Sequence, residues 1–223
     1  MTAPQPVSPD LPEAKSQRRA AITADELMQA ALDILGPHRS ISSLGLREIA
    51  RQAGIAPNSF YRHFHDVDEL AIALIKRAGN QLRSIIGSAR KQAVQPDGAR
   101  ADSVVESSML VFMQQLNAEE GYLRFLLREG RAGSDAFKAA VEQELTFFEN
   151  ELQTDLVNLE RQLGHDIYAP HLVAKAITQL AFAMGAVAAE LDETGQQQVL
   201  AETVSMIQMI ISGARVMGAK RGS

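Results

Sequence analysis

The 223-residue sequence contains no cysteine and no tryptophan, and aromatic residues make up only 5% of it. The lack of cysteine excludes disulfide bonds, thiolate catalysis and cysteine-ligated metals. No unbroken apolar run approaches the roughly 18 residues that a membrane span needs, and the N-terminus shows no signal-peptide pattern. We therefore expect a soluble, cytoplasmic protein without a membrane partner.

Patterns that carry catalysis or metal binding are also missing. The sequence shows no set of nucleophile, base and carboxylate, and no glycine loop of the kind that binds phosphate. Among the five histidines, His63 and His65 would diverge by about 200° on a helix, and His165 and His171 suggest no better ligand set. We expect neither an enzyme nor a metal site nor a bound cofactor.

The alternation typical of β-strands does not occur, and the sequence predicts an all-α protein of about nine helices. Eight apolar residues between Phe137 and Leu163 step by three or four positions, which predicts one long amphipathic helix. Capping patterns and prolines mark where helices begin. The expected starts are at Thr23 with Glu26, Gly45, Asp66 with Glu69, Asn117 with Glu120, Ser134, Pro170, and Thr194 with Gln197.

Residues 46–64 are the most informative segment. The apolar spacing predicts a short helix that ends near Gly54, and Pro57 suits the first turn of a second one. Phe60 and Phe64 lie four residues apart and point the same way. The neighbouring polar residues of that helix must therefore point away from them: Asn58, Ser59, Tyr61 and Arg62. A short braced helix with such a face suits base reading in the major groove, although an ordinary helical hairpin would share this pattern.

Residues 22–70 resemble the DNA-binding domain of TetR-family repressors, with the A-x-x-A-G turn at Ala50–Gly54 and the F-Y-x-H-F helix at Phe60–Phe64. The stretches 46–70 and 125–145 are similar to the family branch that represses unsaturated fatty-acid synthesis (FabR and DesT). The resemblance implies a helix-turn-helix domain followed by a helical ligand-binding and dimerisation domain. It further implies that a hydrophobic effector regulates DNA binding.

The resemblance implies that Arg47, Asn58, Ser59 and Tyr61 reach base edges and that His63 contacts phosphate. Helical geometry independently turns Asn58, Ser59, Tyr61 and Arg62 outward. Ser42 and Ser43, just before the first of the two helices, are candidates for phosphate contacts. An ion pair of Arg47 with Asp33 or Glu48 is the alternative role for that arginine.

The charge is divided unevenly along the chain. Residues 1–93 hold 12 Lys and Arg against 9 Asp and Glu, whereas residues 94–223 hold 10 against 18, within a net charge of −5. A DNA-contacting front and an acidic rear fit this division. We predict a disordered tail at 1–19, a helix-turn-helix domain at 20–66 and a ligand-binding and dimerisation domain at 67–223.

The segments 172–191 and 199–217 are apolar nearly all round, which indicates burial on several sides. A homodimer with a four-helix interface is the expected arrangement, and a monomer with these helices in its centre is the alternative. The predicted interface residues are Ile177, Leu180, Met184, Ile207, Ile210 and Ile211.

A ligand cavity is expected between the rear helices, lined by Phe112, Met113, Phe125, Phe147, Phe148, Phe182 and Met184. Plain core packing is the alternative for each of these residues. Arg124, Arg128 and Arg131 are candidates for the phosphates of an acyl thioester, but an ordinary Glu120–Arg124 pair is favoured.

The sequence therefore predicts a dimeric, ligand-responsive transcriptional repressor of the TetR family, associated with the nucleoid. Its expected partners are double-stranded operator DNA, a second copy of itself and a hydrophobic effector. A long-chain acyl thioester is the expected effector, with genes of unsaturated fatty-acid metabolism as targets. Two alternatives stay open: a sensor of hydrophobic drugs that controls an efflux gene, and an all-helical lipid carrier or enzyme.

Overall fold

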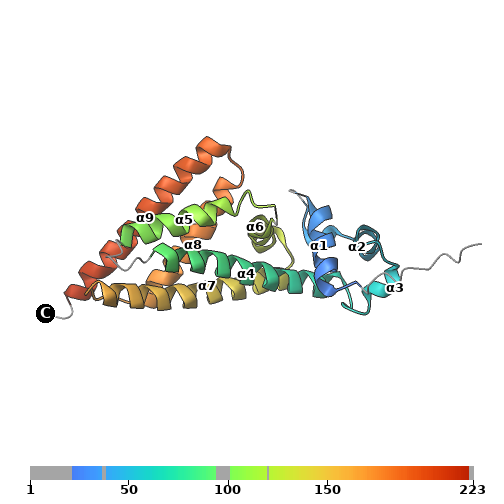
Figure 1. Cartoon of the computed structure of the whole chain (residues 1–223), viewed down its shortest axis with the longest axis horizontal. Coiled ribbons are helices and arrows are strands. Elements are labelled where there is room, and N and C mark those ends of the chain that lie inside the picture. The colour runs from blue at the N-terminus through green and yellow to red at the C-terminus, as the bar shows by residue number, and fades with distance from the viewer. Residues whose placement is uncertain (1–21, 37–38, 94–100, 120, 221–223) are drawn as a thin grey trace, which may run out of the picture.

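The computed structural model describes residues 22–36, 39–93, 101–119 and 121–220, and these are helical for most of their length without any strand (Figure 1). The expected all-α class is confirmed for this part of the chain. The predicted tail at 1–19 lies outside it. The elements are α1 (Ala24–Leu35), the 3-10 helix η1 (Ile41–Ser43), α2 (Leu46–Gln52), α3 (Pro57–Phe60), α4 (Val67–Ala93), α5 (Ala101–Gln114), α6 (Tyr122–Ala132), α7 (Asp135–Gln162), α8 (Pro170–Ala188) and α9 (Glu193–Ala219).

The first helix begins at the predicted capping box. The Thr23 hydroxyl accepts a hydrogen bond from the backbone N–H of Glu26, and the Glu26 carboxylate accepts one from the backbone N–H of Thr23 at 2.7 Å. The bond from the Thr23 N–H, together with one that the Thr23 hydroxyl donates to the same carboxylate at 3.0 Å, holds the pKa of Glu26 below its ordinary value. On the inner face of α1, Leu27 is fully buried together with Ile49 of α2 and Phe60 of α3. The three short helices therefore share one small core.

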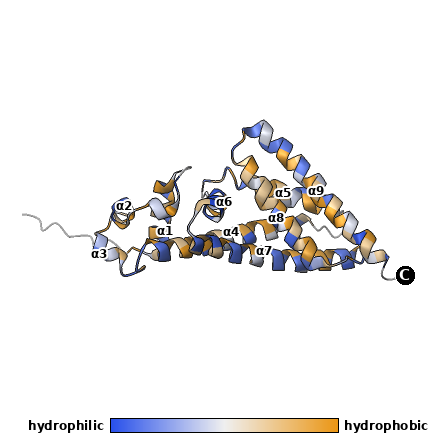
Figure 2. Ribbon diagram, turned by 180° about the vertical axis from the view of Figure 1, so that it is seen from behind, coloured by the Kyte–Doolittle hydropathy of each residue, from blue (hydrophilic) through white to orange (hydrophobic). Residues whose placement is uncertain are grey.

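Helix α4 joins this N-terminal unit to the rest of the molecule. It leaves α3 and runs along the molecule beside α7 (Figures 1 and 2). At its start the backbone N–H of Glu69 donates to the Asp66 carboxylate at 2.8 Å, as the capping pattern predicts. The Glu69 carboxylate reaches one residue further back, to the N–H of His65 at 2.6 Å. One continuous helix, α4, therefore contacts both the N-terminal unit and the C-terminal helices.

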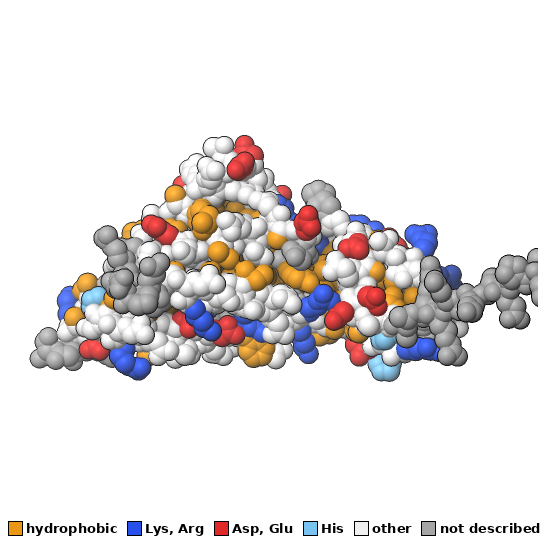
Figure 3. All heavy atoms as spheres, in the orientation of Figure 1, with side chains coloured by type: hydrophobic (Ala, Val, Ile, Leu, Met, Phe, Trp, Pro, Cys, Tyr) orange, Lys and Arg blue, Asp and Glu red, His pale blue; other side chains and the backbone are white. Residues whose placement is uncertain are grey.

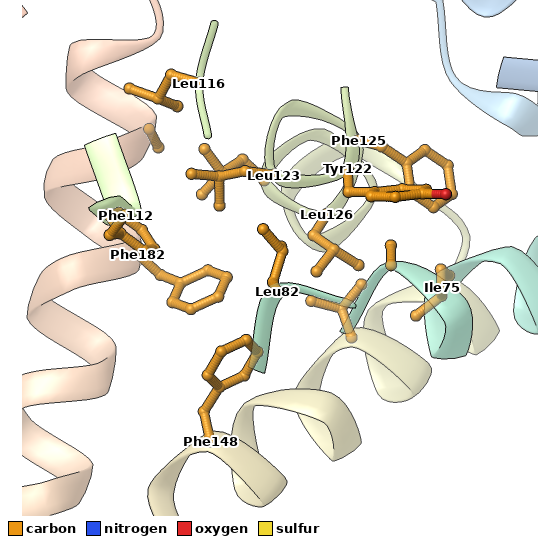
Figure 4. Packing of buried hydrophobic residues seen from close by; sticks show 14 of the residues in the cluster. Ile75, Leu82, Phe112, Leu116, Tyr122, Leu123, Phe125, Leu126, Phe148 and Phe182 are labelled. Atoms are coloured by element: carbon orange, nitrogen blue, oxygen red, sulfur yellow. The ribbon is translucent and has the colours of Figure 1, made fainter. Parts of the chain in front are cut away.

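Three helices of the C-terminal part, α5, α7 and α8, meet around three phenylalanines. Phe112 of α5 and Phe148 of α7 both pack against Phe182 of α8, with ring centroids 5.5 and 5.4 Å apart and edge-on geometry (Figure 4). The apolar stripe predicted for 137–163 supplies the inner face of α7, where Phe137 is fully buried and Leu156 is 5% exposed.

Two helix starts differ from the prediction. Helix α6 begins at Tyr122 after Gly121, whose φ of +65° turns the chain, and not at Asn117 with Glu120. The backbone N–H of Asn117 bonds to the carbonyl of Gln114 and so continues the end of α5; Glu120 lies outside the described residues. Helix α9 is capped by Asp192, whose carboxylate accepts from the N–H of Gly195 at 2.9 Å. The predicted Thr194 start was wrong, because an ionised carboxylate two residues earlier is the stronger acceptor.

Helices α8 and α9 are long and apolar enough on average to cross a membrane, although polar residues interrupt both before an apolar run reaches about 18 residues. Figure 2 shows apolar residues along both helices, interrupted by polar ones on α9. The core helices of soluble proteins pass the same length and composition test, so this property is weak evidence for a membrane span.

Candidate DNA-binding surface and ligand cavity

The turn between α2 and α3 holds the two helices as a rigid pair. Gly54 has a φ of +69°, in the left-handed region that favours glycine, and the N–H of Ile55 donates back to the carbonyl of Ala50 at 3.0 Å. Beyond the turn, Phe60 is fully buried and Phe64 is 6% exposed, with ring centroids 5.9 Å apart. This aromatic pair anchors α3 from the inside.

The opposite side of α3 faces outward. Regular helix covers only Pro57–Phe60, and turns continue it through His63. Tyr61 is 58% exposed, and the edge of its ring packs against Phe60 at a centroid distance of 6.1 Å. Among the predicted DNA-contacting residues of this segment, Asn58, Tyr61 and Arg62 are exposed. Ser59 and His63 are half-buried.

Arg47, at the start of α2, is exposed and has no ion-pair partner among the described residues. Glu48, one of the two acids predicted as alternative partners of Arg47, pairs with Arg39 instead, with nitrogen–oxygen distances of 3.0 and 3.2 Å. These hydrogen bonds hold the pKa of Glu48 low and that of Arg39 high. Asp33, the other acid offered, accepts from Gln29 instead. Arg47 is thus available to a ligand. Helical spacing did not reveal that Arg39 competes with it for Glu48, because Arg39 and Glu48 are nine residues apart in the sequence.

Ser42 and Ser43 lie on η1 and are exposed, beside the N-terminus of α2. The Ser43 hydroxyl donates to the carbonyl of Ser40 at 2.7 Å, and the hydroxyls of Ser42 and Ser40 are 2.9 Å apart. Both predicted phosphate-contacting serines therefore have internal partners, and contact with a phosphate would add to these bonds or replace them.

Helix α6 makes a direct polar link to the N-terminal unit. The Glu129 carboxylate is fully buried and accepts from the Ser40 hydroxyl at 2.8 Å and from the backbone N–H of Ile41 at 3.1 Å. Beside it, the Arg128 guanidinium donates to the carbonyl of Gly36, at the end of α1, at 2.8 Å. Burial lowers the pKa of Arg128. No sequence spacing signals this link, because its partners are about 90 residues apart.

A cavity of about 390 Å³ lies between α4, α5, α7, α8 and α9. Its walls are mostly aliphatic and aromatic, and its volume falls in the range of small-molecule sites. Figure 3 shows hydrophobic side chains gathered over the middle of the C-terminal part of one face. Residues that line the cavity include Ile86, Val104, Met109, Phe112, Phe148, Leu152, Leu156, Ile177, Thr178, Phe182, Ile207 and Ile211.

Three of the seven predicted cavity residues, Phe112, Phe148 and Phe182, line this cavity. The other four do not: Met113, Phe125, Phe147 and Met184. Phe125 is buried in the core, with its side chain on α6 (Figure 4), and Met113 is also a core residue. Phe147 is 40% exposed, because one step along a helix rotates it about 100° from Phe148. Helical spacing alone did not show which helix faces surround the space.

The six predicted interface residues divide into two groups. Ile177, Ile207 and Ile211 are at most 7% exposed and line the cavity, so the protomer itself buries them. Leu180, Met184 and Ile210 are half-buried. The large apolar residues of this region that are exposed are Leu172, Val187, Leu191, Met209, Val216 and Met217.

The arginines considered as phosphate ligands are used internally. Arg124 donates to the backbone carbonyls of Leu116 and Ala189, which ties the ends of α5 and α8 together. Arg128 takes part in the link to α1, and only Arg131 is exposed. The favoured Glu120–Arg124 pair involves a residue outside the described ones.

These features together define a helix-turn-helix unit with a polar outer face, connected by α4 and α6 to a helical domain with an apolar cavity. Residues 27–74 match the family model of bacterial regulatory proteins, tetR family. The chain therefore carries an N-terminal domain of the TetR family, as its A-x-x-A-G and F-Y-x-H-F motifs predict.

Solved structures of several regulators, one of them described as a TetR-family transcriptional regulator, share the fold beyond this domain. One from Pectobacterium atrosepticum is 18% identical, with a TM-score of 0.64 over 86% of this chain and 94% of that one. The fatty acid degradation regulator FadR from Bacillus halodurans is 14% identical, with a TM-score of 0.63 over 87% and 97%. AibR, in complex with isovaleryl coenzyme A and operator DNA, is 13% identical, with a TM-score of 0.59 over 82% and 96%.

Proposed function

We propose that this chain is a dimeric, ligand-responsive transcriptional repressor that binds operator DNA through α3. The observation that carries the proposal is the exposed row of Asn58, Tyr61 and Arg62 on a helix braced from inside by buried Phe60. Hydrogen-bonding and planar side chains on such a helix are suited to base edges in the major groove. Arg47 adds an exposed cation at the start of α2.

A second copy of the chain is the proposed partner of α8 and α9. Along α8, Leu180, Met184 and Val187 follow one another at steps of four and three, which places them on one face. Exposed Leu191 follows just after the end of this helix. On α9, exposed Met209 and Val216 flank the level of Gly213, where no atom lies within 4 Å of an added Cβ. Pairing these faces would bury them and place two α3 helices in successive major grooves, roughly 34–36 Å apart.

The proposed effector is a long-chain acyl thioester that occupies the cavity. Its apolar walls suit an acyl chain, for which each buried methylene contributes about 0.8 kcal/mol. The names of two structural neighbours support this class: FadR is described as a fatty acid degradation regulator, and the AibR structure contains isovaleryl coenzyme A. We extend that class to a regulator of unsaturated fatty-acid metabolism because a bent cis chain and a straight one would fill the cavity differently.

The route from cavity to DNA runs through α4 and α6. Ile86 of α4 lines the cavity, and the same helix packs against α1 and η1 at its other end. Glu129 of α6 fixes the beginning of η1. An effector can change DNA affinity only by the difference in its affinity for two dimer shapes, so either a rise or a fall is possible.

The test is a titration of operator DNA, selected from a random duplex pool, in the presence of different ligands. Matched saturated and unsaturated acyl-CoAs are compared with free CoA and with a hydrophobic cationic dye at one salt concentration. We expect the acyl-CoAs to change the operator affinity. The size of this change should grow with chain length until the cavity is full. A response to the dye alone would replace lipid sensing by drug sensing, and failure to select any duplex would reject DNA binding.

A further inference from the structure

A polar groove of about 450 Å³ lies between α4 and α7, next to the apolar cavity. Three residues line both spaces: Arg90, Lys91 and Asp155. The Arg90 Nε donates to Asp155 Oδ2 at 2.8 Å, and the Arg90 side chain is only 12% exposed. This ion pair therefore lies at the boundary between an apolar space and a polar one.

We propose that the groove is the subsite for a phosphorylated head group, and that the Arg90–Asp155 pair opens when the head group binds. The tail of the same amphiphile would lie in the cavity. This proposal rests on the proposed function, because it assumes that the cavity takes an acyl chain. It adds a location for the charged part of the ligand, away from Arg124 and Arg128.

The groove offers what a phosphate requires. Arg90 and Lys91 supply the positive charges that a phosphate could use, beside the carboxylate of Asp155. Arg83 and Glu151 also line the groove, but they pair with each other at 3.2 Å. Lys91 is exposed and has no ion-pair partner among the described residues. The hydroxyls of Ser84 and Ser88 also line the groove and supply neutral donors. Phosphate oxygens accept charge-assisted hydrogen bonds from such a set more strongly than neutral acceptors would.

The ion pairs along α4 differ in how easily a ligand could displace them. Arg83 bonds to Glu144, which is 4% exposed, and its guanidinium lies 5.0 and 5.6 Å from the ring centroids of Phe147 and Phe148. Asp155 is 32% exposed, and water can solvate its carboxylate when Arg90 turns to a phosphate. The Arg83 pair is therefore a fixed attachment of α4 to α7, whereas the Arg90 pair is exchangeable.

The experiment measures ligand affinity of the full-length protein by calorimetry. Palmitoyl-CoA is compared with a neutral palmitoyl thioester of N-acetylcysteamine, which carries the same chain without phosphate. The variants are Arg90→Gln, Lys91→Gln and Asp155→Asn, with Lys76→Gln as a matched control, because Lys76 is exposed on the same helix α4 and lines neither the groove nor the cavity. Lysophosphatidate with a palmitoyl chain serves as a second phosphorylated ligand.

We expect Arg90→Gln and Lys91→Gln each to weaken palmitoyl-CoA binding roughly tenfold and to leave the neutral thioester unchanged, as loss of a charge-assisted bond predicts. Asp155→Asn should tighten palmitoyl-CoA, because it removes the competing carboxylate. Equal effects on both thioesters, or none on palmitoyl-CoA, would overturn the subsite while leaving lipid sensing intact. Absence of any acyl thioester binding by the parent protein would instead reject the proposed effector. If lysophosphatidate responds to the variants as palmitoyl-CoA does, the subsite is supported and the phosphate itself is what it recognises.

Discussion

At the scale of single residues, local spacing predicted the outer face of α3 but not the partners of its neighbours. Phe60 and Phe64 are buried as their four-residue separation predicts, and Tyr61 lies outside. The partner of Glu48 could not be predicted, because Arg39 belongs to a non-helical segment before η1. Helical periodicity describes which residues share a face of one helix, whereas contacts between segments depend on the path of the turns.

The first prediction concerns recognition of bases. Arg47→Ala and Tyr61→Ala should each weaken operator binding, by about 1–3 kcal/mol for Arg47 if it contacts a base bidentately. Because both side chains are exposed, helix content and assembly should stay unchanged. The measurement is a salt-controlled titration, with Arg131→Ala as the control. Parent-like affinity of both variants would show that this face does not read the operator.

A second prediction follows from the Arg39–Glu48 pair. The pKa of Glu48 in the folded protein lies below its ordinary value of 4.5, because Arg39 donates to the carboxylate. The pair therefore stabilises the fold fully above about pH 4.5, and this contribution is lost as the pH falls through the folded pKa. Glu48→Gln should lower the urea midpoint at about pH 7 and change it less at about pH 3.

The effect of this substitution should be small, because the pair is exposed to solvent. Glu142→Gln, at an exposed position of α7, is the control for the loss of one negative charge. A midpoint difference between Glu48→Gln and the parent that does not depend on pH would show that the ion pair contributes no stability.

At the scale of elements, the sequence predicted those helices whose caps are local. Thr23, Asp66 and Ser134 all act as caps where their patterns placed them. The start of α6 was predicted wrongly because it depends on the left-handed conformation of Gly121. The role of α6 was not predictable at all, since Glu129 looks like a surface residue until the fold brings η1 against it.

We predict that Glu129→Gln loosens this attachment. The Glu129 carboxylate accepts from the Ser40 hydroxyl and the Ile41 N–H, whereas a glutamine amide has only one, neutral, acceptor oxygen for these two donors. A buried polar group that loses its partner costs about 1–3 kcal/mol. Amide hydrogens of residues 40–44 should therefore exchange faster, and operator affinity should fall because η1 precedes α2. Hydrogen exchange by mass spectrometry measures this, with Arg131→Gln as the control on the same helix. Unaltered exchange at 40–44 would mean that the link does not hold the N-terminal unit.

At the scale of the whole molecule, the sequence indicated that α8 and α9 are apolar nearly all round, but not what covers each face. A cavity and a subunit interface both remove a side chain from water, so their residues have the same composition. The fold separates them: Ile177 and Ile207 line the cavity, whereas Val187 and Met209 are 49% and 65% exposed. A charge at Ile177 would therefore disturb the cavity and the core, and it would not report on assembly.

The exposed positions give the sharper test of the dimer. Val187→Glu or Met209→Glu should dissociate it, because pairing would bury an unpartnered carboxylate, while the monomer stays folded since both side chains are exposed in the protomer. Leu110→Glu is the matched control, because Leu110 is 47% exposed on α5, outside the proposed interface. Sedimentation velocity at micromolar concentration should show a dimer for the parent and the control, and a folded monomer for the two variants. The monomers should also bind a full operator more weakly than the dimer, since each carries one α3 helix and cannot span two half-sites. A parent protein that sediments as a monomer would refute the dimer, and dimeric variants would place the interface on another face.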